Sequence, residues 1–281
     1  MKKILYFTIA LLITTACDKI PADERRTVSD GLPDWQGQYV LLQDFTGVQC
    51  VNCPASTREI KRLKTIFDDK LIVVKLHPQT NFNVPIGALS DTNVDLRNAQ
   101  AQEYFLYYGG DLPLPTSFVM QKNERLSKPD LYYGKVMGYY ARQAVATIDL
   151  TAVLADNTIN LNTDIVFTNN YRANGNIQLS LMILEDSLLV FQQTTPAEGT
   201  ILRNYRQDNV LRDMATPLWG DQIAGNSVAK DSKFNRKRTI DLNPEWKPEN
   251  LSVVAILFDN DTKEVIQCAK IKSSTRPEGD M

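Results

Sequence analysis

The sequence predicts two folded parts, an α/β segment at residues 38–146 followed by an all-β antiparallel sandwich at residues 147–281. Two apolar runs with an amphipathic stretch between them predict a buried strand, a helix and a second buried strand in the first part. Six short β-rich runs, separated by turn residues, follow in the second part. The 281 residues are enough to form both parts.

The first seventeen residues, MKKILYFTIALLITTAC, have the layout of a secretory signal. A positive head precedes an apolar run that is too short to span a membrane as a helix. The small residues that follow end at Cys17, which resembles the lipobox of bacterial lipoproteins. That resemblance implies a signal peptide at 1–16 and acyl chains, such as palmitate, on Cys17 as the membrane anchor. The alternative is an ordinary signal with a cysteine downstream by chance.

Residues 17–37 are polar and are interrupted by Pro21, Gly31 and Pro33, which predicts a lipidated flexible stalk. The formal net charge is −2, and no basic stripe is present, so nucleic acid is not expected as a partner. Four cysteines are too few for a disulfide scaffold. Because an exported chain lies outside the reducing cytosol, a disulfide between Cys50 and Cys53 is allowed.

The first buried strand is predicted at residues 39–46 and the second at 70–76. Between them, Pro54 suits the first turn of a helix. Apolar residues then recur at helical spacing: Ile60, Leu63, Ile66 and Phe67. Cys50 and Cys53 therefore lie where a strand turns into a helix, a position in which the free amides and the helix dipole favour a thiolate.

This context resembles the thioredoxin fold. Asp44, six residues before Cys50, matches the buried acid of thioredoxins, and Lys75 matches the lysine that faces that acid. The stretch LPLPTSFVM resembles the loop with a cis-proline beside the cysteine pair, and Pro115 would be that proline. Two further stretches match helices of that fold: residues 103–110 and 128–146. No tryptophan precedes Cys50, and residues 78–100 are expected to form an additional loop over the site.

Three interpretations of the cysteine pair are open. A redox pair would use Cys50, with the lower thiol pKa and the greater exposure, to attack a partner disulfide, and Cys53 to resolve the product. Asp44 would then accept the proton of Cys53, unless Asp44 and Lys75 form only an ordinary buried ion pair. Alternatively, the disulfide is structural. A zinc site would need two more ligands, and His77 is interpreted as a loop residue or strand-end cap, so neither metal nor cofactor is expected.

The six β-rich runs predict an antiparallel sandwich of the immunoglobulin-like kind. They are TIDLTAVLA, TINLNTDIVFT, NIQLSLMIL, RKRTIDLN, LSVVAILFD and EVIQCAKIK. Cys268 lies in the last run and is expected to be a small buried apolar residue.

Residues 194–225 are too long for a hairpin turn and predict a functional loop. The loop holds residue types that are enriched at protein contacts: Tyr205, Arg206, Asn209, Arg212 and Trp219. The alternative is a loop that covers a sheet edge and turns Val210, Leu211 and Leu218 inward.

The whole arrangement resembles the Omp28-related outer-membrane lipoproteins of Bacteroidetes, most specifically in QDFTGVQCVNCP and DNVLRDMATPLWG. The resemblance implies a lipid-anchored protein of the outer membrane. Two functions are predicted from different classes. One is thiol-disulfide exchange on exported proteins that carry thiols. The other is a non-catalytic accessory lipoprotein that binds a β-barrel importer or another envelope protein.

Overall fold

The computed structural model of the chain describes residues 31–275, so the predicted signal peptide, Cys17 and most of the stalk lie outside the described residues. In the first half, residues 40–76 form the predicted strand, helix and strand. β1 and β2 are parallel, in register from Val40 opposite Leu71 to Phe45 opposite Leu76. The elements of this half are β1 (Val40–Phe45), α1 (Cys53–Phe67), β2 (Leu71–Leu76), α2 (Ala99–Tyr107), β3 (Thr116–Val119) and α3 (Tyr132–Tyr140).

The last helix of this half is shorter than predicted. Residues 128–146 were expected to form a helix, but α3 covers only Tyr132–Tyr140. The reason is backbone pairing after the helix, because Gln143 bridges Gly37 and the N–H of Ala144 donates to Gln36 O. Those bonds extend the chain and lead it into the next strand.

All six β-rich runs of the second half are strands, and they account for its main structure. The strands of this half are β4 (Ala146–Ala155), β5 (Thr158–Phe167), β6 (Tyr171–Arg172), β7 (Ile177–Glu185), β8 (Leu188–Gln193), β9 (Ile201–Gln207), β10 (Val210–Met214), β11 (Asp221–Ala224), β12 (Ser227–Val228), β13 (Lys233–Asp241), β14 (Leu251–Asp259), β15 (Val265–Lys272) and β16 (Ser274–Thr275). Cys268, in β15, is fully buried as predicted.

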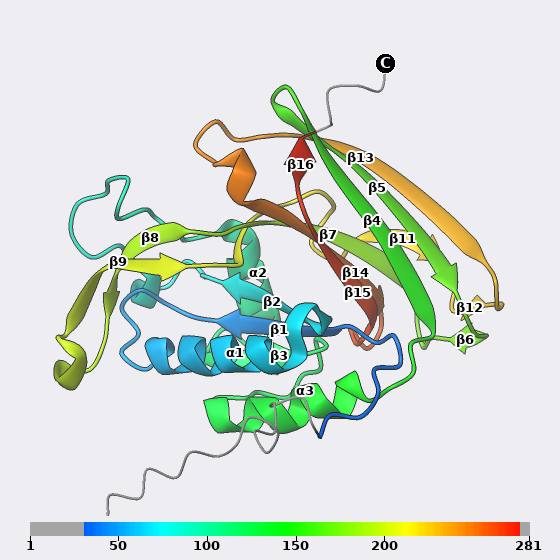
Figure 1. The fold of residues 1–281 in the computed structure, drawn as a ribbon, viewed down its shortest axis with the longest axis horizontal. Coiled ribbons are helices and arrows are strands. Elements are labelled where there is room, and N and C mark those ends of the chain that lie inside the picture. Colours follow the sequence, from blue (N-terminus) through cyan, green and yellow to red (C-terminus); the bar gives the residue numbers. More distant parts are fainter. Residues whose placement is uncertain (1–30, 276–281) are drawn as a thin grey trace, which may run out of the picture. The chain divides into compact units, whose positions relative to one another are not determined.

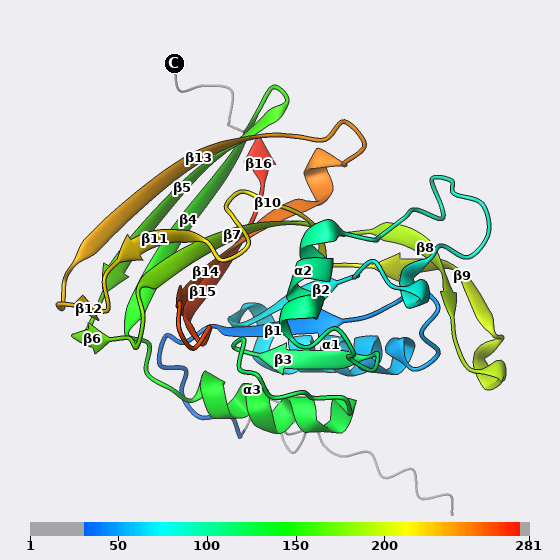
Figure 2. The same ribbon diagram turned by 180° about the vertical axis from the view of Figure 1, so that it is seen from behind.

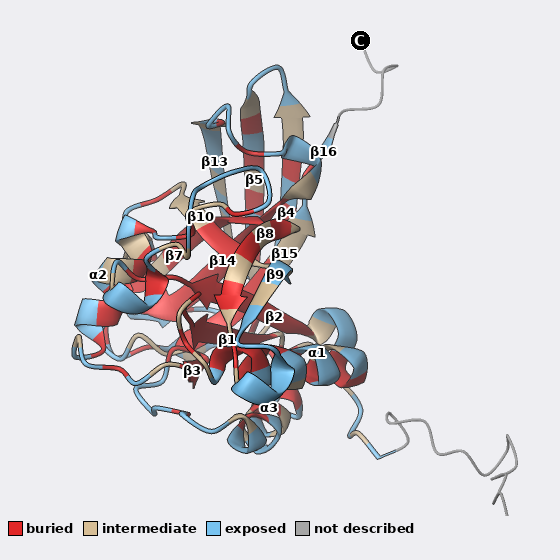
Figure 3. Ribbon diagram, turned by 90° about the vertical axis from the view of Figure 1, so that its left-hand side faces the viewer, coloured by how far each residue is buried: buried red, intermediate tan, exposed pale blue. Residues whose placement is uncertain are grey.

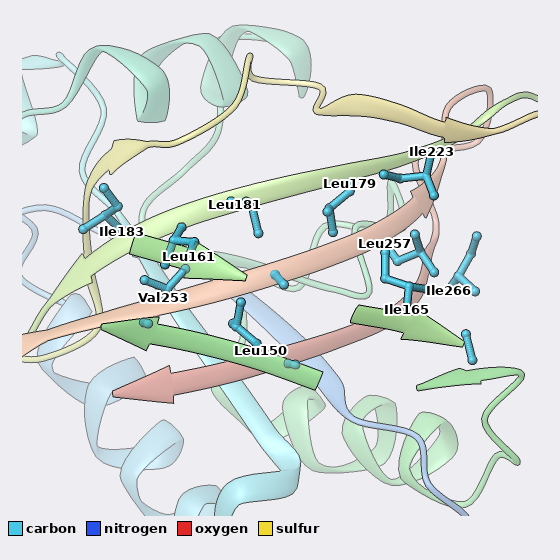
Figure 4. Packing of buried hydrophobic residues seen from close by; sticks show 14 of the residues in the cluster. Leu150, Leu161, Ile165, Leu179, Leu181, Ile183, Ile223, Val253, Leu257 and Ile266 are labelled. Atoms are coloured by element: carbon cyan, nitrogen blue, oxygen red, sulfur yellow. The ribbon is translucent and has the colours of Figure 1, made fainter. Parts of the chain in front are cut away.

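The core of the second half lies between two sheets. One contains β15, β14 and β7, and the other runs in the order β13-β5-β4-β16. Side chains from both sheets meet in one cluster, for example Leu150, Leu161, Leu179 and Leu257 (Figure 4). In β5 buried and less buried residues alternate, because one face packs on the core and the other faces outward.

A single sheet connects the two halves. Its strand order is β15-β14-β7-β10-β2-β1-β3, and β11 also pairs with β7. β10 makes the connection, since it runs antiparallel to β7 and pairs with β2 at Val210 and Lys75. The strands of this sheet can be followed by their labels in Figure 1. Buried residues are concentrated in the sheet, while the helices keep exposed outer faces (Figure 3). The two predicted parts therefore share one sheet, and their division after residue 146 stays a prediction.

The prediction of a long loop at 194–225 is wrong. This segment contributes β9, β10 and β11, and β8 with β9 forms a separate two-stranded hairpin. Its alternative, a loop that covers a sheet edge, is wrong as well, although Val210 and Leu211 are buried. β10 lies inside the sheet, so pairing on both sides outweighs the weak β propensity of its polar residues.

Candidate functional site around the cysteine pair

Cys50 and Cys53 form a disulfide at the end of β1. Cys53 is the first residue of α1, Asn52 is its N-cap, and Pro54 lies in the first turn as predicted. Cys50 is 4% exposed and Cys53 is 1% exposed. Cys50 is thus the more exposed of the two, as predicted, although both residues are buried.

The β8–β9 hairpin lies against the segment that carries the disulfide. The side-chain amide of Gln192 donates to Gly47 O at 3.0 Å and to Cys50 O at 3.2 Å. The backbone N–H of Gln193 donates to Val48 O at 2.7 Å. The hairpin, which belongs to the second half of the sequence, thereby closes the site formed by the first half.

Residues 78–100 approach the same segment from another direction, as the sequence predicts. The backbone N–H of Gln49 donates to Phe82 O at 2.8 Å, and its side chain donates to Val84 O at 2.8 Å. A Cβ on Gly47 would come within 2.7 Å of Phe82 O, so only glycine allows this close approach. Both ribbon views place this loop next to the hairpin (Figures 1 and 2).

Asp44 is fully buried behind the start of α1. Its Oδ1 accepts hydrogen bonds from Ser117 at 2.8 Å and from Ser56 at 3.1 Å, while Oδ2 has no partner among the described residues. Burial raises the pKa of this carboxyl from 3.8 to about 6, against the nearby charge of Lys75 and the two hydroxyl hydrogen bonds. Asp44 can therefore exchange a proton close to neutral pH.

Lys75 lies opposite Asp44 in the β1–β2 register, as predicted. Nevertheless, the expectation of an ordinary ion pair is wrong, since no salt bridge within 4.0 Å joins the two among residues 31–275. The ammonium group donates instead to Thr57 Oγ1 at 3.0 Å and to Gln207 Oε1 at 2.7 Å. Burial lowers the pKa of Lys75 to about 8.

A buried hydrogen-bond chain connects Lys75 to the disulfide segment. Lys75 donates to Gln207, the side chain of Gln207 donates to Gln192 at 3.2 Å, and Gln192 donates to Cys50 O. Both glutamines are 1% exposed. The sequence analysis missed them, because a glutamine in a strand carries no signal of what it will face.

Two further expectations concern the surroundings of the pair. The Leu114–Pro115 peptide bond is cis, which confirms the predicted isomer. His77 directly follows β2 and lies outside any helix or strand, as predicted, and it is buried. Its Nδ1 is 2.9 Å from Asn83 Oδ1, and burial lowers its pKa to about 3. Residues 31–275 hold no cluster of three or more potential metal ligands. Within the same range, no helix is both long and apolar enough to cross a membrane.

Two of the five predicted contact residues are neighbours on β9 and differ in their exposure to solvent. Tyr205 is half-buried and packs against the cluster that contains Val48 and Val190. Arg206 is exposed and its Nε is 2.7 Å from an oxygen of Asp208. Tyr205 thus helps to hold the hairpin in place, whereas Arg206 faces solvent.

The other three lie beyond β9. Asn209 forms the turn into β10 with a φ of 60°, a left-handed conformation that asparagine tolerates. Arg212 is on β10, with its Nε 3.5 Å from Glu185 Oε2. Trp219 packs edge-on against Tyr107, with ring centroids 4.6 Å apart. All five residues therefore contact other parts of the chain, and they are spread over several elements.

A family model described as "Outer membrane protein Omp28" matches residues 120–276, more than half of the chain. This match includes DNVLRDMATPLWG and excludes the cysteine pair. None of the curated proteins matches the chain in sequence.

Several solved structures are similar. HBP35 of Porphyromonas gingivalis superposes with a TM-score of 0.65 at 15% identity, covering 87% of this chain and 79% of its own. A protein from Agrobacterium tumefaciens has a TM-score of 0.50 at 11% identity, covering 86% and 97%. A domain of the outer membrane lipoprotein Omp28 from P. gingivalis gives 0.33 at 18% identity, covering 48% and 93%. At these identities, the similarity to the first two concerns the fold alone.

Proposed function

This chain belongs to the Omp28 family of outer membrane proteins, and on that premise we propose that it is a lipid-anchored binding protein whose Cys50–Cys53 disulfide is structural. Family membership confirms the resemblance that the sequence predicted. The observation that carries the proposal is the burial of both cysteines, in a segment whose backbone carbonyls accept hydrogen bonds from the β8–β9 hairpin. The partner we expect is an envelope protein, such as a β-barrel importer.

We infer that the first half is thioredoxin-like. Support comes from the parallel β1–β2 pair, the antiparallel β3, the helix that begins at Cys53 and the cis-proline at 115. The second half is a sandwich of the immunoglobulin-like kind, supported by its two sheets and their shared core. Both folds serve as scaffolds for catalysis in some proteins and for binding in others. The function therefore has to be inferred from the residues around the disulfide and not from the fold.

Accessibility separates the two functions. Thiol-disulfide exchange requires a sulfur to reach a partner disulfide, so its rate depends on access. Here both cysteines are buried, and Gln192 and Gln193 hold the hairpin on the disulfide segment. Because both cysteines are buried, this segment has to open before a folded substrate protein can reach either sulfur. The geometry therefore supports binding more than catalysis.

Thiol-disulfide exchange is the second candidate, favoured by the protonation of Asp44 near neutral pH. In that reaction the reduced protein is the electron donor. The Cys50 thiolate attacks a partner disulfide, forms a mixed disulfide and releases one partner thiolate. Cys53 then passes its proton to Asp44 and attacks Cys50, which releases the second partner thiolate and restores the Cys50–Cys53 disulfide.

An insulin-reduction assay with dithiothreitol tests the choice. We expect the native protein to accelerate insulin reduction no more than the Cys50→Ser/Cys53→Ser double variant does, because the sulfurs are covered. Thioredoxin serves as the positive control. The opposite result would be repeated catalytic turnover by the native protein and none by the double variant. It would overturn the structural role of the disulfide and show that the protein is an oxidoreductase.

The lipid anchor is proposed from Cys17, which lies outside the described residues. A Cys17→Ser variant should move from the membrane fraction to the soluble fraction, because it cannot accept acyl chains. Fractionation and mass spectrometry of the N-terminus measure this, with Cys268→Ser as a control that keeps Cys17. Unchanged membrane association without acyl chains would contradict the anchor.

A further inference from the structure

A surface cavity brings together the two segments that the sequence singled out as contact regions. Its volume is about 520 Å³, which is within the range of small-ligand sites. Residues of the 78–100 loop line this cavity together with Arg212 of β10, Leu188 and Glu245.

Arg212 is held in place with most of its hydrogen-bonding capacity unused. Its side chain is 17% exposed, its Nε is 3.5 Å from Oε2 of the buried Glu185, and its guanidinium lies 6.0 Å from the centre of the Trp246 ring. No hydrogen bond within residues 31–275 uses its Nη1 or Nη2. A guanidinium whose Nε faces one buried carboxylate, and whose Nη atoms make no hydrogen bond within the described residues, suits a second carboxylate, which can accept two parallel hydrogen bonds.

Negative charge lines the same cavity. Asp95 is already paired with Arg97 at 2.6 Å. Asp91 and Glu245 are exposed, and their side chains take part in no ion pair of the described chain. These two carboxylates are available to a cation. They would also repel a ligand that carried negative charge alone.

The remaining surface of the cavity is aliphatic. Leu89 is 58% exposed, and Val94 and Leu188 add further apolar surface to the same cavity. Leu188 and Val94 belong to the cluster that anchors β8, so this part of the wall is rigidly supported. An aliphatic side chain of a ligand would be sheltered from water here.

We propose that this cavity binds a short peptide with free ends and an aliphatic side chain. The peptide carboxylate would accept hydrogen bonds from Arg212, its ammonium group would pair with Asp91 or Glu245, and its side chain would cover Leu89. A simple anion could pair only with Arg212, and a simple cation could pair only with Asp91 or Glu245. A zwitterion can pair with the positive and the negative side chains at the same time. This inference goes beyond the proposed function, because it adds a small peptide ligand to the envelope protein expected there as the partner.

Isothermal titration of the full chain with the tripeptide Ala-Leu-Ala tests the proposal. We expect binding at micromolar to millimolar concentrations. The N-acetylated and the C-amidated forms of the same peptide should each bind about tenfold more weakly or worse, because each lacks one charge. Equal affinity for the free and capped peptides, or no binding of the free peptide at millimolar concentrations, would overturn it.

Variants locate the site. Asp91→Asn and Glu245→Gln change exposed residues and should weaken the free peptide but not its N-acetylated form. Asp149→Asn, in the outer sheet, is the matched control and should leave both unchanged. Arg212→Gln should abolish the preference for a free carboxylate, and circular dichroism checks that it still folds. Equal weakening by Asp91→Asn and Asp149→Asn would place the peptide elsewhere and overturn the assignment.

The outcome can be separated from that of the proposed function. The Cys50→Ser/Cys53→Ser variant should bind the tripeptide as the native protein does, because the cavity residues do not include the cysteines. If insulin is reduced while the tripeptide still binds at Arg212, the structural role of the disulfide is contradicted and peptide binding in the cavity is supported. If the protein neither reduces insulin nor binds the tripeptide, only the peptide-binding proposal is contradicted.

Discussion

Replacing Gln192 by leucine should speed the reduction of the Cys50–Cys53 disulfide by about tenfold or more. The leucine keeps the volume of the side chain but removes the donor to Gly47 O and Cys50 O and the acceptor for Gln207. Leaving a buried polar partner unsatisfied costs about 1–3 kcal/mol, and about 1.4 kcal/mol corresponds to a factor of ten in the population of an opened hairpin. The rate of reduction follows that population.

The neighbouring residue provides a matched control. Gln193 lies on the same strand, but its side chain is only half-buried and makes no hydrogen bond within residues 31–275. Gln193→Leu should therefore leave the reduction rate unchanged, while Gln207→Leu should raise it, since Gln207 belongs to the same chain from Lys75.

The measurement is the rate of reduction by a water-soluble phosphine, followed by alkylation and mass spectrometry. Thermal unfolding of each variant shows that the effect arises in the folded protein. Identical rates for Gln192→Leu, Gln193→Leu and the native protein would mean that the hairpin does not control access to the disulfide.

Replacing Asp44 by asparagine should raise the free energy of unfolding at pH 8 by about 1–2 kcal/mol and flatten its dependence on pH. The folded-state pKa is about 6, against an ordinary 3.8, so ionisation of the buried carboxyl opposes folding. A difference of about two pKa units is worth about 3 kcal/mol. Part of this gain is offset, because Lys75 loses a nearby opposite charge in the variant.

The sign of the pH effect follows from proton binding. Between about pH 4 and pH 6 the folded protein keeps the Asp44 proton while the unfolded chain releases it. The contribution of Asp44 to stability is therefore fully present below pH 4 and is lost as the pH rises through 6. Urea unfolding of the native protein and Asp44→Asn at pH 4 and pH 8 measures it, with the exposed Asp241→Asn as the control. Parallel pH profiles for the native protein and Asp44→Asn would contradict the role assigned to burial.

Local sequence patterns determined much of the fold. The strands could be predicted from the apolar runs at β1 and β2 and from the six β-rich runs, because each run shows which residues are buried within one element. The proline in the first turn of α1 marked the start of that helix. Asp44 and Lys75 were predicted instead from the resemblance to the thioredoxin fold, and the β1–β2 register places them opposite each other. The family was also recognisable, since DNVLRDMATPLWG lies within the matched region.

Only the tertiary structure decided how the two halves combine. β10 was hidden in the sequence, because its stability comes from pairing with β2 and β7, which lie far away along the chain. Likewise, nothing near Cys50 in the sequence shows that Gln192 will donate to its carbonyl. Local patterns identify the cysteine pair as a strand-to-helix motif, but its accessibility depends on contacts across more than a hundred residues. Such contacts form only when the whole chain packs, so the closure of the site could not be derived from the motif that marks it.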